Sequence, residues 1–105
     1  MDKVLSLLGL AKKAGKAKSG GFQTDRAVKD GTAKLVIVAE DASDRTKKQY
    51  RDACAYYNVP LMIYGTKETL GHAMGEELRS GMAVLDEGLA RAILPGIRKG
   101  KTEKE

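Results

Sequence analysis

The most informative chemical feature of the sequence is a glycine pair followed by polar and basic side chains. Gly20 and Gly21 precede a segment expected to be helical, and the first N–H groups of a helix have no partner within it. The N–H groups of Gly20, Gly21 and Phe22 therefore form a site that suits a phosphate. Gln23 and Arg26 are three residues apart and share one helix face. An amide and a guanidinium suit bidentate hydrogen bonds to purine edges. This face is therefore predicted to bind the backbone of a nucleic acid and to contact its bases.

The basic side chains gather around this segment. Residues 1–34 carry eight basic and three acidic side chains, residues 35–90 carry six and nine, and residues 91–105 carry five and two. Nucleic acid is the favoured partner, because each phosphate that a lysine or arginine neutralises releases counterions. Two plainer readings stay open: a charged surface that only favours solubility, and a glycine turn with no role in binding. The clustered basic residues are Lys12, Lys13, Lys16, Lys18, Arg26 and Lys29.

Other residues with catalytic potential form no convincing site. Residues 9–16 lack the spacing of a nucleotide-hydrolysing phosphate loop, and Ala17 stands where Ser or Thr would hold magnesium. His72 falls in the middle of a predicted helix, and Cys54 falls on an apolar helix stripe, where it is expected to be buried. No nucleophile is paired with a base by spacing. The sequence therefore predicts a protein that is not an enzyme and needs no cofactor.

Length and composition exclude several classes of protein. The chain has 105 residues and a mass of 11.3 kDa, which is the size of one domain. No run approaches the roughly 18 apolar residues that span a bilayer, and no signal peptide is recognisable, so we expect a cytoplasmic protein. One cysteine and one histidine cannot supply an internal disulfide or a Cys/His zinc site, so no metal is expected.

Capping residues and apolar runs define the elements that must position the glycine pair. Asp2, Ser43 and Asp86 are predicted helix caps, and Pro95-Gly96 is a predicted helix stop. Three short apolar runs are expected to be strands, and the first of them, which lacks alternation, is the predicted central strand. The expected helices with their caps and stops cover residues 2–15, 20–31, 43–58, 66–75 and 86–96, and the strands cover residues 35–39, 61–64 and 82–85.

Strands that alternate with helices predict an α/β fold, a three-layer α/β/α sandwich with a small mixed β-sheet. Residues 16–19 are interpreted as a short basic link between the first two helices, and residues 76–81 as a loop. We expect residues 1–98 to form a single nucleic-acid-binding domain and residues 99–105 to form a charged flexible tail.

The order of residues after the first helix is similar to the signature of a known family. A helix-opening glycine, Gln23, a basic residue three positions later and Gly31 precede an aliphatic strand that ends in Ala39-Glu40-Asp41. The second half also matches, with Asn58-Val59-Pro60-Leu61 before a strand and residues 66–75 before a loop. Over about residues 3–95 the chain resembles the ribosomal protein L7Ae/L30e family, and residues 7–16 resemble its small bacterial YlxQ-type branch.

The resemblance implies a noncatalytic protein that binds structured RNA, typically a kink-turn, a sharply bent helix with a bulge beside tandem sheared G·A pairs. Gln23 and Arg26 occupy the positions that reach the sheared purines, and Gly20 and Gly21 lie where backbone approaches the RNA. The loop that packs on the flipped-out nucleotide contains Leu78, Arg79 and Ser80. RNA is generally read at such distortions, where bases are splayed out.

The complete predicted RNA-binding set also includes flanking basic side chains and the aromatic residue of the helix start. We expect a ribosomal or ribosome-associated protein whose partner is structured RNA, such as ribosomal RNA, with no DNA and no membrane partner. The set consists of Lys16, Lys18, Gly20, Gly21, Phe22, Gln23, Arg26, Lys29, Leu78, Arg79 and Ser80.

Three residues depart from the family's pattern. Phe22 stands where the family usually has a polar residue such as Asn or Lys, and it either stacks on a base or fills the core; we favour the core. Asp25 replaces an uncharged residue near the predicted phosphates and opposes their binding by like-charge repulsion. Arg79 adds a cation where the family tends to be apolar, which favours a variant kink-turn.

Two other functions stay open at the level of the sequence. The first is a protein-interaction adaptor that has lost specific RNA binding and docks through the acidic residues 40–52 or Glu76-Glu77; Phe22 and Asp25 favour it. The second is a small enzyme that acts on a phosphorylated substrate at the Gly20-Gly21 helix start. The combination of Gly20, Gln23 and Arg26 favours RNA binding over both.

Overall fold

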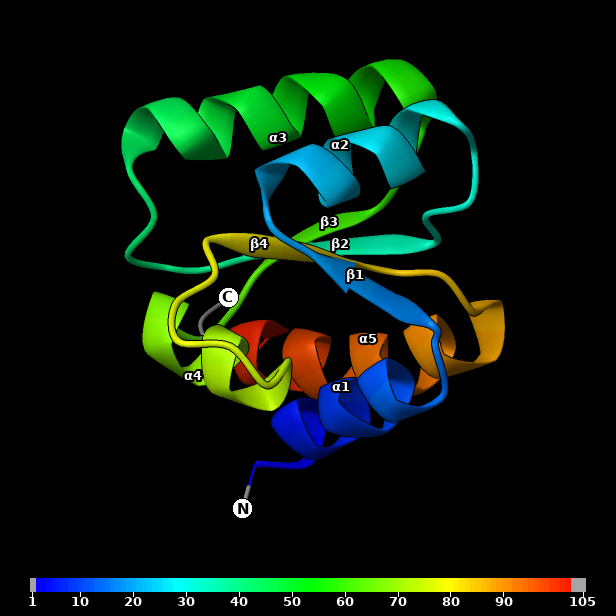
Figure 1. Cartoon of the computed structure of the whole chain (residues 1–105), viewed down its shortest axis with the longest axis vertical. Helices are drawn as coiled ribbons and strands as arrows, with labels where there is room; N and C mark the ends of the chain where they lie inside the picture. The colour runs from blue at the N-terminus through cyan, green and yellow to red at the C-terminus, as the bar shows by residue number, and fades with distance from the viewer. Residues whose placement is uncertain (1, 103–105) are drawn as a thin grey trace.

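The three predicted layers are present in the structure, a computed structural model that describes residues 2–102, with side chains for residues 2–94. A four-stranded mixed sheet forms the middle layer of these residues (Figure 1). One face of the sheet is covered by α2 (Gly21–Lys29) and α3 (Asp44–Tyr57). The other face is covered by α1 (Lys3–Lys13), α4 (Lys67–Ala73) and α5 (Glu87–Thr102). The predicted α/β fold is confirmed.

Three of the helices begin at the predicted capping residues. The carboxylate of Asp2 accepts hydrogen bonds from the N–H groups of Val4 (2.7 Å) and Leu5 (3.2 Å) at the start of α1. Ser43 caps α3 by accepting from the N–H of Thr46 at 3.1 Å, and Asp86 accepts from Gly88 and Leu89 in α5. These side chains satisfy N–H groups that the helices cannot satisfy internally.

The sheet has the order β1-β4-β2-β3. Its strands are β1 (Ala17–Ser19), β2 (Leu35–Val38), β3 (Leu61–Ile63) and β4 (Gly81–Val84). β4 pairs antiparallel with both β1 and β2, and β2 pairs parallel with β3. All four residues of β2 are buried, as expected for a strand covered on both faces.

The edge strand β1 was not predicted, and the interpretation of residues 16–19 as a basic link is wrong. Ala17, Lys18 and Ser19 pair with Val84, Ala83 and Met82 of β4. A strand of this length contains too few residues to show alternation, and Lys18 is typical of an exposed sheet edge. The strand β1 forms because it pairs with β4. It is followed directly by the start of α2.

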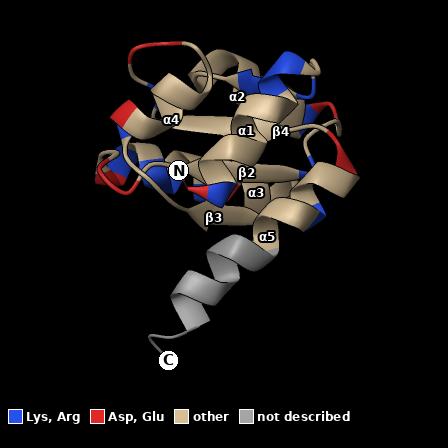
Figure 2. Ribbon diagram, turned by 90° about the horizontal axis from the view of Figure 1, so that it is seen from below, with Lys and Arg blue, Asp and Glu red and all other residues tan. Residues whose placement is uncertain are grey.

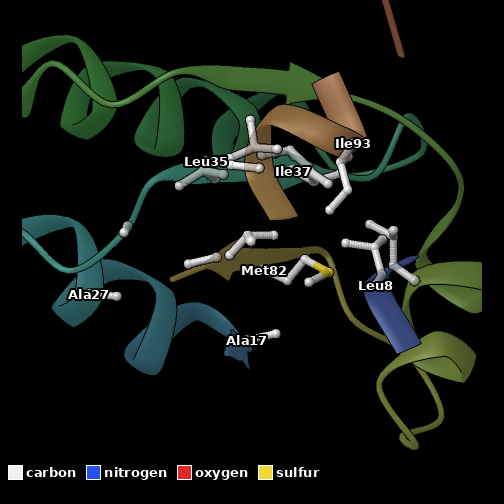
Figure 3. Close-up of a cluster of buried hydrophobic side chains, with 14 of the residues drawn as sticks. Leu8, Ala17, Ala27, Leu35, Ile37, Met82 and Ile93 are labelled. Atoms are coloured by element: carbon white, nitrogen blue, oxygen red, sulfur yellow. The ribbon is translucent and has the colours of Figure 1, made fainter. Parts of the chain in front are cut away.

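The core lies on both faces of the sheet (Figure 3). Leu8 of α1 and Ile93 of α5 pack on one face, and Ala27 of α2 packs toward the other. Leu35, Ile37 and Met82 of the central strands are fully buried between them. Burial of this apolar surface stabilises the sheet and fixes the positions of its strand ends.

The last helix continues beyond its predicted stop. Pro95-Gly96 was expected to end α5, but the helix extends to Thr102, so that prediction is wrong. An internal proline removes one backbone donor and favours a kink without always ending a helix, and α5 is held by packing against α1 and β4. Residues 103–105 of the predicted tail lie outside the described residues.

Charged positions lie around the periphery of the fold, and the labelled strands carry none of them (Figure 2). Within residues 2–102, no helix is both long enough and apolar enough to cross a bilayer.

Candidate nucleic-acid interface

The start of α2 is open and lies beside the loop that precedes β4. Gly20 is the N-cap residue with φ 91°, a left-handed conformation that favours glycine. Its N–H donates to the carbonyl of Gly81 at 3.1 Å, so it is not the unpaired donor that the sequence predicted. No side chain caps this helix within the described residues, which leaves the first-turn N–H groups of Gly21, Phe22 and Gln23 without a side-chain acceptor.

The loop of residues 76–80 is fixed against α4. The N–H of Arg79 donates to the carbonyl of Lys67 at 3.0 Å, and the N–H of Glu76 donates to the carbonyl of Gly71 at 2.7 Å. A Cβ on Gly71 would lie 2.6 Å from the carbonyl oxygen of Glu77, so this glycine allows the loop to contact the helix backbone. The loop is therefore held in place before any ligand arrives.

The side chain of Arg79 ties this loop to β1. Its Nε donates to Ser19 Oγ at 3.1 Å, its Nη1 donates to the carbonyl of Leu78 at 2.9 Å, and its Nη2 pairs with Glu76 Oε1 at 3.1 Å. All three contacts use the edge of the guanidinium. These in-plane contacts do not themselves prevent an aromatic ring from stacking on a face of the group, whose side chain is 31% exposed.

A hollow between α2, α3 and the loop, called here the α2–α3 hollow, brings together several predicted residues. Its lining from the start and first turns of α2 consists of Gly20, Gly21, Phe22 and Asp25, and its lining from the loop consists of Leu78, Arg79 and Ser80. α3 adds side chains that sequence reasoning missed, namely Thr46, Gln49 and Tyr50. Burial raises the pKa of Tyr50, so its hydroxyl stays protonated at neutral pH and can donate a hydrogen bond.

A second hollow, called here the β1–α2 hollow, adjoins the first one at Phe22. Its lining includes Lys18 of β1 and the two predicted base-reading residues, Gln23 and Arg26. All three side chains are exposed. The structure therefore brings together the helix start, the pair Gln23 and Arg26, and the loop of residues 76–80 around one aromatic residue.

The two apolar side chains of this region are exposed. Leu78 is 56% exposed, so it is available for contact with a ligand. Phe22 is 77% exposed, and the interpretation that it fills the core is wrong. Phe22 lies in the first turn of α2, on the side away from the buried Thr24, Ala27 and Val28, and so cannot reach the core.

The predicted flanking lysines differ in their surroundings. Lys16 precedes β1 and Lys18 is its middle residue, and both are exposed. Lys29 pairs with Asp25 at 3.0 Å, one helix turn away, and the hydrogen bond to Asp25 raises the pKa of this lysine. The charge of Asp25, which sequence reasoning expected to oppose binding, is therefore compensated locally, although such an exposed pair contributes little to stability.

Cys54 and His72, the two side chains with catalytic potential, lie in α3 and α4 on opposite faces of the sheet. Burial raises the pKa of the Cys54 thiol to about 11, so little thiolate is present at neutral pH. His72 is exposed on α4, on the opposite side of the sheet from α2. Among the described residues, no group of His, Cys, Asp and Glu side chains is arranged to hold a metal ion.

Comparison with known proteins relates the chain to one family. Residues 2–94 match the ribosomal protein L7Ae/L30e/S12e/Gadd45 family. The chain is 40% identical to the RNA-binding protein YlxQ of Bacillus subtilis over 88 residues, which cover 84% of this chain and 88% of that protein. It is 35% identical to the RNA-binding protein YlxQ of Enterococcus faecium over 90 residues, or 86% of each chain.

Solved structures share the fold. A protein of unknown function from Bacillus halodurans superposes with a TM-score of 0.88 and 38% identity, covering 92% of this chain and 98% of that chain. The Giardia lamblia 15.5kD RNA binding protein superposes with a TM-score of 0.76 and 24% identity, covering 93% and 84%. At the lower identity the likeness concerns the fold alone.

Proposed function

The chain belongs to the ribosomal protein L7Ae/L30e/S12e/Gadd45 family, and we propose that it is a noncatalytic RNA-binding protein that recognises a kink-turn or a similarly bent, bulged RNA. The observation that carries the proposal is the convergence of the open α2 start, Gln23 and Arg26 with the fixed loop of residues 76–80. The relatives from B. subtilis and E. faecium, both named RNA-binding proteins, support it.

Backbone groups supply the first part of the proposed mechanism. The N–H groups of Gly21 and Phe22 point out of the helix start, where the helix dipole favours negative charge. Gly21 has no heavy atom within 4 Å of the place that a Cβ would occupy, so a sugar or phosphate can approach the backbone there. A phosphate held at this point sets the position of the neighbouring bases without reading their sequence.

Side chains supply the second part. Gln23 and Arg26 lie along one face of α2 and can donate hydrogen bonds to purine edges exposed by sheared G·A pairs. Across the α2–α3 hollow, exposed Leu78 and a face of the Arg79 guanidinium offer a surface for a nucleotide that has left the stack. Lys16 and Lys18 are placed to contact phosphates nearby.

The proposed ligand must contact two surfaces at once: the face of α2 with Gln23 and Arg26, and the loop surface with Leu78 and Arg79. A straight A-form duplex has a deep, narrow major groove that side chains cannot read and no unstacked nucleotide for the loop. A bent RNA with a bulge presents both accessible purine edges and an unstacked nucleotide. The family's ribosomal members make ribosomal RNA the first place to seek the natural target.

A binding titration tests the proposal. The protein should bind a kink-turn hairpin more tightly than a straight duplex of the same length at near-physiological salt. Gln23→Ala and Arg26→Ala should each weaken binding to the kinked RNA by roughly 1–3 kcal/mol, as loss of a base-edge contact does. Arg91→Ala, which removes an exposed arginine of α5, is the matched control and should leave this affinity unchanged. Equal affinity for the kinked and straight RNAs would refute the proposal.

A further inference from the structure

Phe22 is the most exposed apolar side chain at the candidate interface. It is the single phenylalanine of the chain, and 77% of its surface is accessible. An exposed phenyl ring in the first turn of a polar helix contributes nothing to the core, which is formed by the opposite side of α2. Burial of this ring against a ligand would remove a large apolar surface from water, so its position favours a role in binding.

The surroundings of Phe22 define what it would contact. The ring lines the α2–α3 hollow together with Leu78 and Arg79, and it lines the β1–α2 hollow together with Gln23 and Arg26. It therefore stands on the boundary between the surface proposed to hold an unstacked nucleotide and the surface proposed to read paired purines. Tyr50, the other aromatic residue of the α2–α3 hollow, is 7% exposed and offers a ligand little of its ring.

We propose that Phe22 is a stacking wedge that makes this chain selective for RNAs in which an unpaired nucleotide directly adjoins the purine step contacted by Gln23 and Arg26. The inference rests on the proposed function and adds a specificity-determining residue to it. Every nucleobase has a π-face, so the ring detects the presence of a base next to the step and tolerates changes in its identity.

The loop of residues 76–80 supports such a contact because its backbone is hydrogen-bonded to α4 and holds its position. Arg79 is held along its guanidinium edge by Ser19, Glu76 and the carbonyl of Leu78, and none of these three contacts uses a face of the group. A base that contacts Phe22 can thus also meet Leu78 or Arg79 on the loop side of the hollow. Because the Arg79 side chain is fixed before binding, little of its conformational entropy is lost when the base enters.

A protein–RNA cycle tests the wedge. The probes are a kink-turn hairpin with its bulge intact and the same hairpin with an abasic site at the bulged nucleotide adjoining the G·A pairs. The proteins are the unmodified chain, Phe22→Leu, Phe22→Tyr and Tyr56→Leu. Tyr56 is 80% exposed on α3 and does not line either hollow, so its substitution is a matched loss of an exposed aromatic ring. Thermal melting confirms that each variant is folded.

We expect Phe22→Leu to bind the intact hairpin at least about 5-fold more weakly, the lower end of the range for a lost base–aromatic stack. The abasic site should weaken the unmodified chain by a similar factor and Phe22→Leu by much less. Phe22→Tyr should retain both the affinity and the sensitivity to the abasic site, and Tyr56→Leu should behave like the unmodified chain.

Two results overturn the wedge while leaving the proposed function intact: no loss in Phe22→Leu on the intact hairpin, or an equal loss on the intact and abasic hairpins. If the unmodified chain does not distinguish the kinked hairpin from a straight duplex, the proposed function fails and the wedge fails with it.

Discussion

The α2–α3 hollow and a groove between α1 and α4 are both open depressions between helices, but they differ in the groups that they offer. The groove, called here the α1–α4 groove, is lined by Leu5, Gly9, Leu10, Lys13, His72 and Ala73, and most of its surface is apolar. Leu10 is 57% exposed there, almost the same as Leu78 at 56% in the α2–α3 hollow. Exposure of an apolar side chain therefore does not distinguish the two regions.

The distinguishing feature is the backbone. The α1–α4 groove is formed by two helices, and where it reaches the first turn of α4, at Glu68 and Thr69, the hydroxyl of Thr66 already accepts from the N–H of Thr69 at 3.1 Å. The α2–α3 hollow contains a helix start and a loop, so it offers backbone donors and a charged group held in place. A site for a polyanion is therefore distinguished by oriented donors at the ends of helices and strands, and a depression with an exposed leucine is insufficient.

The largest expected effect concerns glycines in the two helices of the α1–α4 region. Gly71→Ala places a Cβ 2.6 Å from the carbonyl oxygen of Glu77 and should lower the free energy of unfolding by roughly 1–3 kcal/mol through overpacking. Gly9→Ala meets only the carbonyl oxygen of Ala73 at 3.7 Å, an ordinary contact, and should raise stability by about 0.5–1 kcal/mol through helix propensity. Urea denaturation of both variants checks the pair. A neutral Gly71→Ala would show that the loop is free to move away from α4.

The next effect compares the two exposed leucines. Leu78→Ala should weaken binding of a bulged, kinked RNA by roughly 1–2 kcal/mol, because apolar surface buried against the unstacked nucleotide is lost, and should leave binding of a bulge-deleted RNA nearly unaffected. Leu10→Ala removes an equally exposed leucine from the α1–α4 groove and should change neither affinity. Titration calorimetry with both RNAs measures this. An equal effect of the two substitutions would contradict the distinction between the regions.

A smaller effect is expected at the cap of α1. Asp2→Ala should lower the free energy of unfolding by about 0.5–2 kcal/mol, the usual cost of a lost N-cap, without altering RNA affinity of the folded protein. Slight burial raises the pKa of Asp2, but hydrogen bonds from Tyr64 and the N–H groups of Leu5 and Val4 outweigh it and lower the pKa below 3.8. The carboxylate therefore makes its full contribution to the free energy of unfolding above the ordinary pKa of 3.8. This contribution is lost as the pH falls through the lowered pKa of the folded state.

Urea titrations of the unmodified chain and of Asp2→Asn from pH 6 to about pH 2 isolate this carboxylate, since asparagine also caps helices and does not titrate. The stability difference between the two proteins should shrink as the pH falls. A difference that is constant with pH would mean that the charge of Asp2 has no role.

The smallest expected effect concerns lysines. Lys16→Ala or Lys18→Ala should weaken kinked and straight RNAs alike and reduce the slope of log affinity against log salt by less than about 1 unit, because a phosphate contact carries no sequence information. Lys13→Ala, in the α1–α4 groove, should reduce the slope less. Salt titrations of the three variants test this order. A change in discrimination between the RNAs would assign base reading to Lys16 or Lys18.

Local sequence signals determined much of the fold. Asp2, Ser43 and Asp86 marked helix starts because a side-chain oxygen satisfies N–H groups only two or three residues away. The unalternating run of β2 indicated a strand buried on both faces, and Gly20 marked the start of α2. These features were predictable because each depends on neighbours along the chain.

Features that depend on partners distant in the sequence were decided only by the tertiary structure. β1 exists because β4 pairs with it, and Arg79 is held through Ser19, sixty positions earlier in the chain. α3 contributes Gln49 and Tyr50 to the hollow only because it packs beside α2. The exposure of Phe22 followed from the rotation of α2 on the sheet, which buries Thr24, Ala27 and Val28 and leaves the phenyl ring outside. A short helix with few apolar residues permits more than one rotation, and only packing against the sheet selects one.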